Sequence, residues 1–314
     1  MKIIFFVTII TSLFLLISDG FKSLSEGAQE EKANVRNAIL AGSWYPGNKD
    51  TLTKRIEDYL SKVKARSLEG ELKAIIVPHA GYMYSGQVAA HAYRLLQDRD
   101  FKRVIMIGPS HRVGFRGASV NMQSGYKTPL GIVPVDRDLG KRILNADAFI
   151  QGVPRAHASE HSLEIQLPFL QTVLKDFRIV PILMGDQDLK TCSRLARRLA
   201  RVITNMDKTL LLASTDLSHF HSYKRARELD LKFIKHVQEF DPKGLADSLS
   251  SGKCEACGRG PAITVMLAAQ ALGANHTTIL NYANSGDVTG DHGRVVGYLS
   301  AALIRASGKG PHPQ

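Results

Sequence analysis

The chain has 314 residues, an apolar fraction of 44%, and 41 lysines and arginines against 29 aspartates and glutamates, for a formal net charge of +12. This composition excludes an intrinsically disordered chain and supplies enough apolar side chains for one large core or two modest ones. Three cysteines are too few for a scaffold held together by disulfides, and the positive balance favours anionic surfaces or acidic ligands as partners.

Residues 1–20 place one lysine ahead of a charge-free, largely apolar run from Ile3 to Ile17. This is the plan of a secretory signal, and the run is shorter than the roughly 18–20 residues that cross a bilayer comfortably. We therefore expect an exported protein, periplasmic or secreted, that contacts a membrane only if residues 1–20 remain as an uncleaved N-terminal anchor.

The rest of the chain divides into three parts. Residues 21–34 are polar, lack an apolar period and predict a flexible linker, and residues 309–314 predict a disordered tail. Between them, residues 35–308 predict one folded domain.

Short β-branched apolar runs alternate with amphipathic stretches through this domain. The predicted strands are 72–79, 103–111, 177–185, 209–216 and 294–304, and the predicted helices are 86–96, 162–174, 189–204, 224–238 and 261–272. Runs such as Ala74–Val77 and Val104–Ile107 are apolar without alternation, which is typical of strands covered on both faces. We predict a single α/β domain with a largely parallel or mixed central sheet flanked by helices.

The densest basic segment is 193–202, where four arginines recur at helical spacing opposite leucine and valine. No aromatic residues interleave with these arginines, and no known nucleic-acid motif surrounds them. The pattern therefore favours a solvated helix face over a nucleic-acid partner.

Histidines follow the predicted strands at the points where the strands end. His79 follows the first strand, His111 follows the second, and Asp216, His219 and His221 follow a third. The functional crevice of an open α/β sheet lies beyond the carboxyl ends of its strands. Neighbouring proline and glycine restrict the turns that carry His79 and His111, and a metal site needs such rigidity.

Cys257 lies in the segment 253–261, just before a helix predicted to begin near Pro261. A thiolate is favoured beside a helix N-terminus. Cys257 is therefore a further candidate ligand.

The sequence resembles the Memo family from about Ile39 to Leu303. The matching segments are AGSWYPG (41–47), VPHAGYMYSG (77–86), GPSH (108–111), EHSLEIQLPFL (160–170), STDLSHF (214–220), CGRGP (257–261) and NYANSGD (281–287). The resemblance implies a fold related to the class III extradiol ring-cleaving dioxygenases.

The same resemblance implies metal ligation by His79, His111 and Cys257, with Asp216 and His219 lining the pocket. It also implies iron, with copper as a competitor, and a redox role that is poorly defined. Two imidazoles and a thiolate agree with a soft, redox-active or zinc-like ion and disfavour magnesium or calcium.

Two departures from these patterns limit what the resemblance implies. The extradiol dioxygenases use two histidines and a carboxylate on iron, so a sulfur ligand here means that ring cleavage does not follow. In addition, Cys254 forms a Cys-x-x-Cys pair with Cys257. In an oxidising compartment that pair could close into a disulfide and remove the thiolate ligand.

Glu160, His161 and Glu164 lie at a predicted helix start. His161 and Glu164, three apart, share one helix face and could form a hydrogen-bonded pair that orients a ligand, although helix capping or surface pairing explains the spacing equally well. His161 could also act as a general acid or base.

Other polar and aromatic residues have two interpretations. Trp44 and Tyr45 could wall the pocket, although aromatic packing in the core is the favoured interpretation, and Tyr82 and Tyr84 could line its opening. Ordinary turn chemistry explains 284–287, and His292 beyond it is a minor candidate ligand.

The leading hypothesis is an exported metal-binding protein that supports redox or dioxygenase-like chemistry on an unidentified small molecule, with Asp216, His219 and His161 moving protons or orienting ligands. The first alternative is a non-catalytic protein that binds a peptide or small anion in the same pocket. The second is a zinc-dependent hydrolase, in which three protein ligands leave a position for an activated water.

Overall fold

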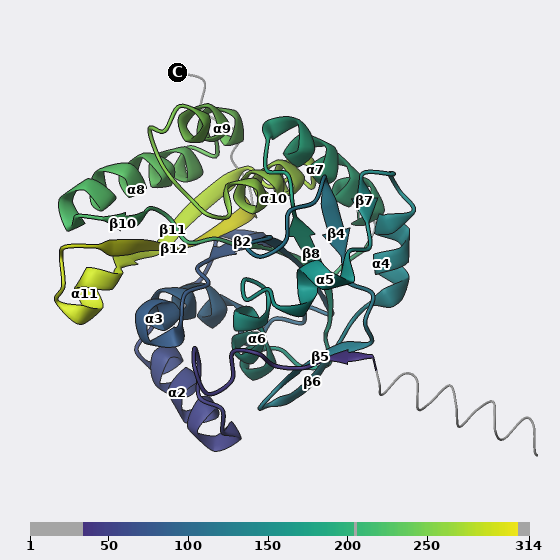
Figure 1. Cartoon of the computed structure of the whole chain (residues 1–314), viewed down its shortest axis with the longest axis horizontal. Coiled ribbons are helices and arrows are strands. Elements are labelled where there is room, and N and C mark those ends of the chain that lie inside the picture. Colours follow the sequence, from purple (N-terminus) through teal and green to yellow (C-terminus); the bar gives the residue numbers. More distant parts are fainter. Residues whose placement is uncertain (1–33, 204–205, 307–314) are drawn as a thin grey trace, which may run out of the picture.

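The computed structural model describes residues 34–203 and 206–306 (Figure 1). The predicted signal or anchor at 1–20, nearly all of the linker at 21–34 and the tail at 309–314 lie outside the described residues. Within the described ranges, no helix combines the length and apolarity that a bilayer crossing requires.

The central sheet of the described residues has nine strands in the order β10-β12-β2-β9-β3-β8-β4-β7, with β11 paired to the free edge of β12. Their bounds are β2 (Gly70–Val77), β3 (Arg103–Pro109), β4 (Ala118–Val120), β7 (Ile150–Gln151), β8 (Arg178–Met184), β9 (Thr209–Ser214), β10 (His219–His221), β11 (His276–Asn284) and β12 (Val295–Ala306). Strands β2, β9, β3 and β8 run parallel, whereas β12 and β4 pair with them in the antiparallel direction. The prediction of a mixed α/β sheet is confirmed.

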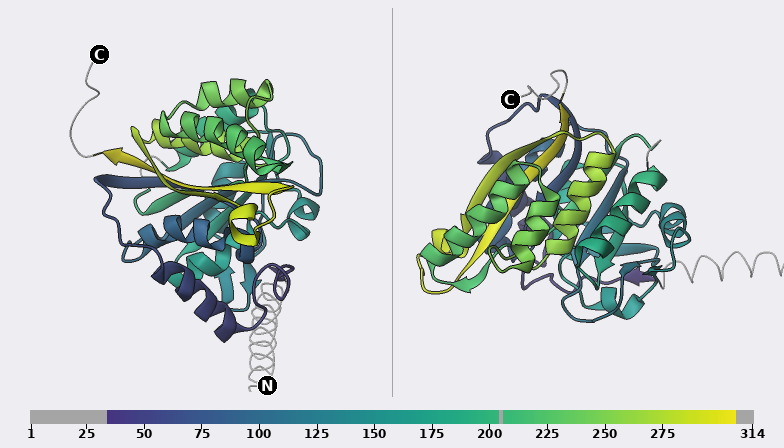
Figure 2. Two further views of the ribbon diagram at one scale, coloured as in Figure 1. Left: turned by 90° about the vertical axis from the view of Figure 1, so that its left-hand side faces the viewer. Right: turned by 90° about the horizontal axis from the view of Figure 1, so that it is seen from above.

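Helices cover both faces of this sheet, as the edge-on view in Figure 2 shows. One face carries α7 (Leu189–Ile203), α8 (Tyr223–Gln238), α9 (Pro242–Ser250) and α10 (Arg259–Ala271), and the other carries α2 (Lys49–Ser61), α3 (Tyr82–Tyr93) and α6 (Leu167–Val173). Alternate residues of β2 pack against the helices on opposite faces of the sheet. Ile75 belongs to the core under α2 and α3, and Ile76 belongs to the core under α7 and α10. Burial on both faces explains why these strands are continuously apolar.

Shorter elements complete the domain. They are the three-stranded sheet β1 (Val35–Arg36), β5 (Gly125–Thr128) and β6 (Gly131–Pro134), and the helices α4 (Arg137–Leu144), α5 (Pro154–Ala158) and α11 (Ser285–Thr289). The helix predicted over 162–174 is shorter than expected, because a 3₁₀ turn at Glu164–Gln166 precedes α6. The turn predicted at 284–287 opens α11 instead, through a capping box between Asn284 and Asp287.

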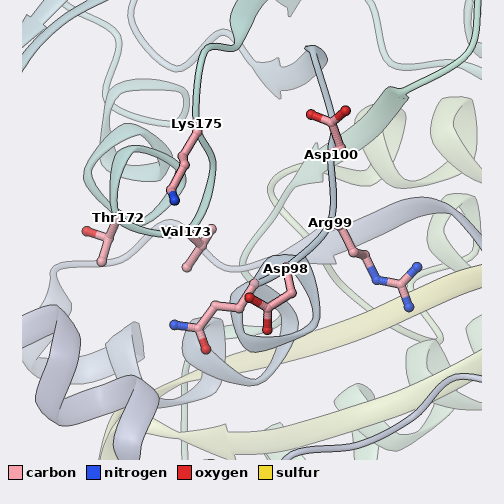
Figure 3. Close-up of a pocket in the computed structure, with 7 residues that line it drawn as sticks. Asp98, Arg99, Asp100, Thr172, Val173 and Lys175 are labelled. Carbon is pink, nitrogen blue, oxygen red and sulfur yellow. The ribbon is translucent and has the colours of Figure 1, made fainter.

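A shallow hollow of about 490 Å³ lies at the amino ends of β3 and β8 (Figure 3). Lys175 and Asp98 contribute to its walls. Its Asp100 carboxylate is already paired with Lys102 and Lys208 at 2.7 and 2.6 Å. The strand-end histidines lie at the opposite edge of the sheet, which is the edge where function is expected in this architecture.

Candidate metal centre

Three imidazoles meet at the carboxyl edge of the sheet. His79 lies two residues beyond β2 and His111 two residues beyond β3, and His161 reaches the same point from the segment between α5 and α6. One ring nitrogen from each lies within 4.8 Å of the others. Imidazole nitrogens bind a first-row metal at about 2.0–2.1 Å, so two donors of one ion lie at most about 4.2 Å apart. Three donors around one ion lie about 3.3–3.6 Å apart, so the ring nitrogens would have to approach one another by up to about 1.5 Å to share it.

The hydrogen bonds around His79 determine which of its ring nitrogens is unprotonated. Nδ1 lies 3.0 Å from Ser214 Oγ, and the single hydroxyl hydrogen of Ser214 is donated to the carbonyl of Ser162 at 2.6 Å. Ser214 must therefore accept from His79, so Nδ1 carries the proton and Nε2 keeps its lone pair. Burial, followed by the neighbouring imidazoles, lowers the pKa of His79 well below its usual value, so the ring is neutral at neutral pH.

His111 is oriented in the same sense by a carboxylate. Its Nδ1 lies 2.9 Å from Glu160 Oε1, and its backbone N–H donates to Glu160 Oε2 at 2.7 Å. Burial opposes ionisation of Glu160, but hydrogen bonds from His111 and from backbone amides outweigh it and lower the pKa of this carboxyl to about 2. An ionised carboxylate only accepts, so Nδ1 of His111 donates and Nε2 is left open, the arrangement seen in metal-binding histidines.

His161 stacks on His111 with ring centroids 4.3 Å apart, and the ring centroid of Trp44 lies 4.7 Å from that of His161. Its Nδ1 is buried without a hydrogen-bond partner among the described residues, although Glu160 Oε1 lies 3.3 Å away in an unfavourable direction. Burial lowers the pKa of His161 to about 4, so it too is neutral. Three imidazoles that converge on one point form a donor set that fits a transition metal ion.

Cys257 lies against the same cluster. Its Sγ is 3.0 Å from Nε2 of His79 and accepts the backbone N–H of Asp216 at 3.3 Å. The residue precedes α10, as expected. Burial and then the charge of Asp216 raise the pKa of the Cys257 thiol well above its usual value, so burial opposes the thiolate that the helix N-terminus favours. Cys192, Cys254 and Cys257 are all free thiols in this structure.

Asp216 and His219 border the centre. Asp216 accepts the backbone N–H of His79 at 2.7 Å, and burial raises its pKa to about 7. The 4.0 Å separation of Asp216 Oδ2 from His79 Nε2 is not an ion pair, because the imidazole is neutral. His219 Nδ1 donates to the carbonyl of Leu217 at 2.8 Å, which leaves its Nε2 as an acceptor.

These groups open into a cavity of about 850 Å³, within the size range of small-molecule sites. Its walls include Trp44, Met83, Tyr84 and Phe220, while His79, His111, His161, Asp216 and His219 also line it. Cys257 contacts His79 from behind this lining.

Three residues predicted to line the pocket lie in the core beside the cavity rather than on its wall. Glu164 is fully buried in an ion pair with Arg36 at 2.5 Å and also accepts from the backbone amides of Ile39 and Leu40. Tyr45 donates to Glu164 at 2.8 Å. Tyr82 donates to the carbonyl of Ile165 at 2.9 Å. Glu164 therefore anchors the N-terminal segment, and Glu160 is the carboxylate that orients a cluster histidine.

The fold and the site together define an α/β protein with a candidate mononuclear metal centre. The family model described as Memo-like protein matches residues 36–302. A MEMO1 family protein of Methanosarcina mazei is 38% identical over 276 residues, covering 86% of this chain and 98% of that protein. Another of Methanopyrus kandleri is 34% identical over 281 residues, covering 86% of this chain and 99% of that protein. The chain belongs to the Memo family.

Among solved structures, an uncharacterized protein from Escherichia coli K12 aligns with a TM-score of 0.48 and 15% identity. The alignment covers 74% of this chain and all of that one.

Proposed function

We propose that this protein binds one redox-capable transition metal ion, iron foremost with copper as a competitor, and supports redox or dioxygenase-like chemistry on a small molecule. The observation that carries the proposal is the pair of unprotonated Nε2 atoms on His79 and His111, the first of which contacts the Cys257 thiol. Each ring is fixed by a hydrogen bond at Nδ1 and lies at a cavity large enough for a ligand. Such an ion would supply electron transfer or oxygen activation.

Cys257 is the third ligand in this proposal, and its support is the 3.0 Å contact with His79 Nε2. The thiol must lose its proton on binding, which a transition metal readily brings about. His161 is the alternative third ligand. If Cys257 binds the ion, the neutral His161 ring is free to accept a proton from a ligand in the cavity.

The chain's other contributions are proton handling and exclusion of water. The pKa of Asp216, near 7, allows its carboxyl to exchange a proton at neutral pH. His219 presents Nε2 as an acceptor from the other side. Trp44 packs against the His161 ring and limits the access of water to it, while His111 is exposed.

Elemental analysis of the full chain, purified anaerobically, tests the proposal. Wild type should carry close to one iron or copper, and His79→Ala with His111→Ala should lose it. His276→Ala is the matched control, because His276 is exposed on β11 away from the cluster. Retention of the metal by the double variant would refute the proposal.

Cobalt(II) substitution separates the two candidate third ligands. A sulfur ligand gives an intense thiolate-to-metal absorption band, which Cys257→Ser should abolish and His161→Asn should leave in place. Absence of that band in wild type would assign the third position to His161.

A second candidate function is ligand binding without turnover, and the large cavity with exposed Met83, Tyr84 and Phe220 favours it. Binding that persists after the metal is removed, without oxygen uptake by the loaded protein, would support it. Zinc alone in the purified protein, together with hydrolytic activity, would instead support the hydrolase.

We also propose that the protein is exported, on the composition of residues 1–20. N-terminal sequencing of protein recovered from the periplasm or the medium tests this. A cytoplasmic product that retains Met1 would contradict it.

A further inference from the structure

Apolar side chains are exposed at the cavity to an unusual degree. Met83, Tyr84 and Phe220 are 59%, 36% and 60% exposed, and all three line it. Large apolar side chains gathered at a concave site mark a surface that a ligand covers. Trp44 and Tyr298 also line the cavity, so four of its lining residues are tryptophan, tyrosine or phenylalanine.

The backbone holds Phe220 in a costly conformation to place its ring there. Phe220 has φ of 62°, in the left-handed region that bulky residues rarely adopt. The pairing of β10 with β12 is irregular between His219 and His221, on either side of it. Strand irregularities of this kind redirect side chains near functional sites. Burial does not compensate the strain, since the ring is exposed.

Arg294 lies over this ring, with its guanidinium carbon 5.1 Å from the ring centroid. Arg294 is exposed, lines the cavity, and has no carboxylate within ion-pair distance among the described residues. It is also the one arginine or lysine among the described residues of the lining. The nearby carboxylate of Asp291 accepts the backbone N–H of Gly293 at 2.9 Å and so is held within its own turn.

Arg294 lies on the side of the cavity formed by the turn before β12, while the imidazole cluster lies at the ends of β2 and β3. A ligand held by the guanidinium can therefore extend across the cavity toward the cluster.

We propose that the cavity binds an aromatic carboxylic acid, whose carboxylate pairs with Arg294 and whose ring lies against Phe220 and Tyr84. A planar guanidinium matches a carboxylate in bidentate geometry, and stacking on Phe220 holds that plane in place. The inference rests on the proposed function only in that the opposite end of the ligand points to the metal centre.

Fluorescence of Trp44, the single tryptophan of the chain, reports binding directly. The probes are benzoate, phenylacetate and 3-phenylpropanoate, each compared with its uncharged amide, titrated into the metal-free full chain. At least one acid should bind wild type about fivefold more tightly than its amide, and added salt should reduce that preference.

Arg294→Gln should abolish the preference and leave amide binding unchanged, and Arg294→Lys should keep part of it. Phe220→Ala should weaken acid and amide alike. Arg201→Gln, on an exposed position of α7, is the matched control and should behave as wild type. Equal binding of acid and amide by wild type, an unchanged preference in Arg294→Gln, or no binding of any probe would each overturn the inference.

Metal content of the same proteins, measured as purified and before the metal is removed for the titrations, separates the two proposals. A chain without specific metal but with an Arg294-dependent acid preference leaves the inference standing and removes the proposed function. A chain that holds iron through His79 and His111 but shows no acid preference leaves the proposed function standing and removes the inference.

Discussion

Glu160 contacts His111 through both carboxylate oxygens, one 2.9 Å from the ring Nδ1 and the other 2.7 Å from the backbone nitrogen. The carboxylate thereby sets both the tautomer and the position of this imidazole. Orientation by a second residue is a large part of what distinguishes a metal ligand from an isolated histidine.

Glu160→Gln should weaken metal binding about 10- to 100-fold, because an amide cannot hold the Nδ1–H tautomer as an ionised carboxylate does. Competition with a chromophoric chelator under anaerobic conditions measures the change. Glu239→Gln, on the exposed end of α8, should bind metal as wild type does. Unchanged affinity in Glu160→Gln would show that the contact with His111 does not support the site.

Glu164→Gln should reduce the free energy of unfolding by about 3 kcal/mol or more, because it leaves the buried Arg36 guanidinium without a counter-charge. Urea unfolding followed by circular dichroism measures the loss. The matched control is Glu71→Gln, which removes the pairings of an exposed carboxylate with Lys73 and Arg305 and should cost less than about 1 kcal/mol. Similar losses in the two variants would contradict the structural role assigned to Glu164.

His157 should make stability depend on pH. Burial lowers its pKa from 6.5 to about 3 in the folded chain, so below pH 6.5 the unfolded chain binds a proton that the folded chain refuses. The stability that the neutral His157 ring contributes is therefore fully present above pH 6.5. As the pH falls below that value, the free energy of unfolding decreases by up to about 1.4 kcal/mol per pH unit.

His157→Gln retains a polar group beside Ser119 and should show a shallower decline of unfolding free energy than wild type between pH 6.5 and 4.5. His276→Gln should decline as wild type does, since that side chain is exposed. Parallel curves for wild type and His157→Gln would contradict the lowered pKa.

Gly117 and Gly290 share a φ of +77° but differ in the space around them. A Cβ at Gly117 would lie 2.1 Å from the carbonyl oxygen of Phe149, whereas a Cβ at Gly290 meets nothing within 4 Å. Gly290→Ala should cost about 1 kcal/mol for the left-handed backbone alone. Gly117→Ala should lower the thermal midpoint much further, and equal midpoints would show that the backbone at Phe149 yields freely.

The strands that carry the histidines were predictable because burial on both faces leaves continuous apolar runs, as in Ala74–Val77. Strand β11 was not predicted. Its residues are mostly half-buried and polar side chains interrupt the run, so neither the apolar nor the alternating pattern is present. Strands β4 and β7 are only three and two residues long, too short for a periodic pattern.

Only part of the site could be predicted from the sequence. His79, His111 and Asp216 line one cavity, as their positions at strand ends predict. His161 joins them from the segment between α5 and α6, and the helical i, i+3 argument for His161 and Glu164 did not apply, because the helical turn begins only at Glu164. Glu160, just outside that turn, faces the cluster instead. The tautomers of His79 and His111 depend on hydrogen bonds between distant segments, which spacing along the chain does not contain.

One seven-residue stretch, 160–166, governs several parts of the protein. Glu160 orients His111, Gln166 donates at 2.9 Å to the Ser214 hydroxyl that orients His79, and Glu164 receives the amides of Ile39 and Leu40. Loading the centre should therefore slow amide hydrogen exchange at Ile39 and Leu40, although neither residue touches the ligands. Substitutions in 160–166 that weaken the hydrogen bonds to the metal ligands should speed exchange of the ion. The same substitutions should also weaken the attachment of the N-terminal segment that contains Ile39 and Leu40.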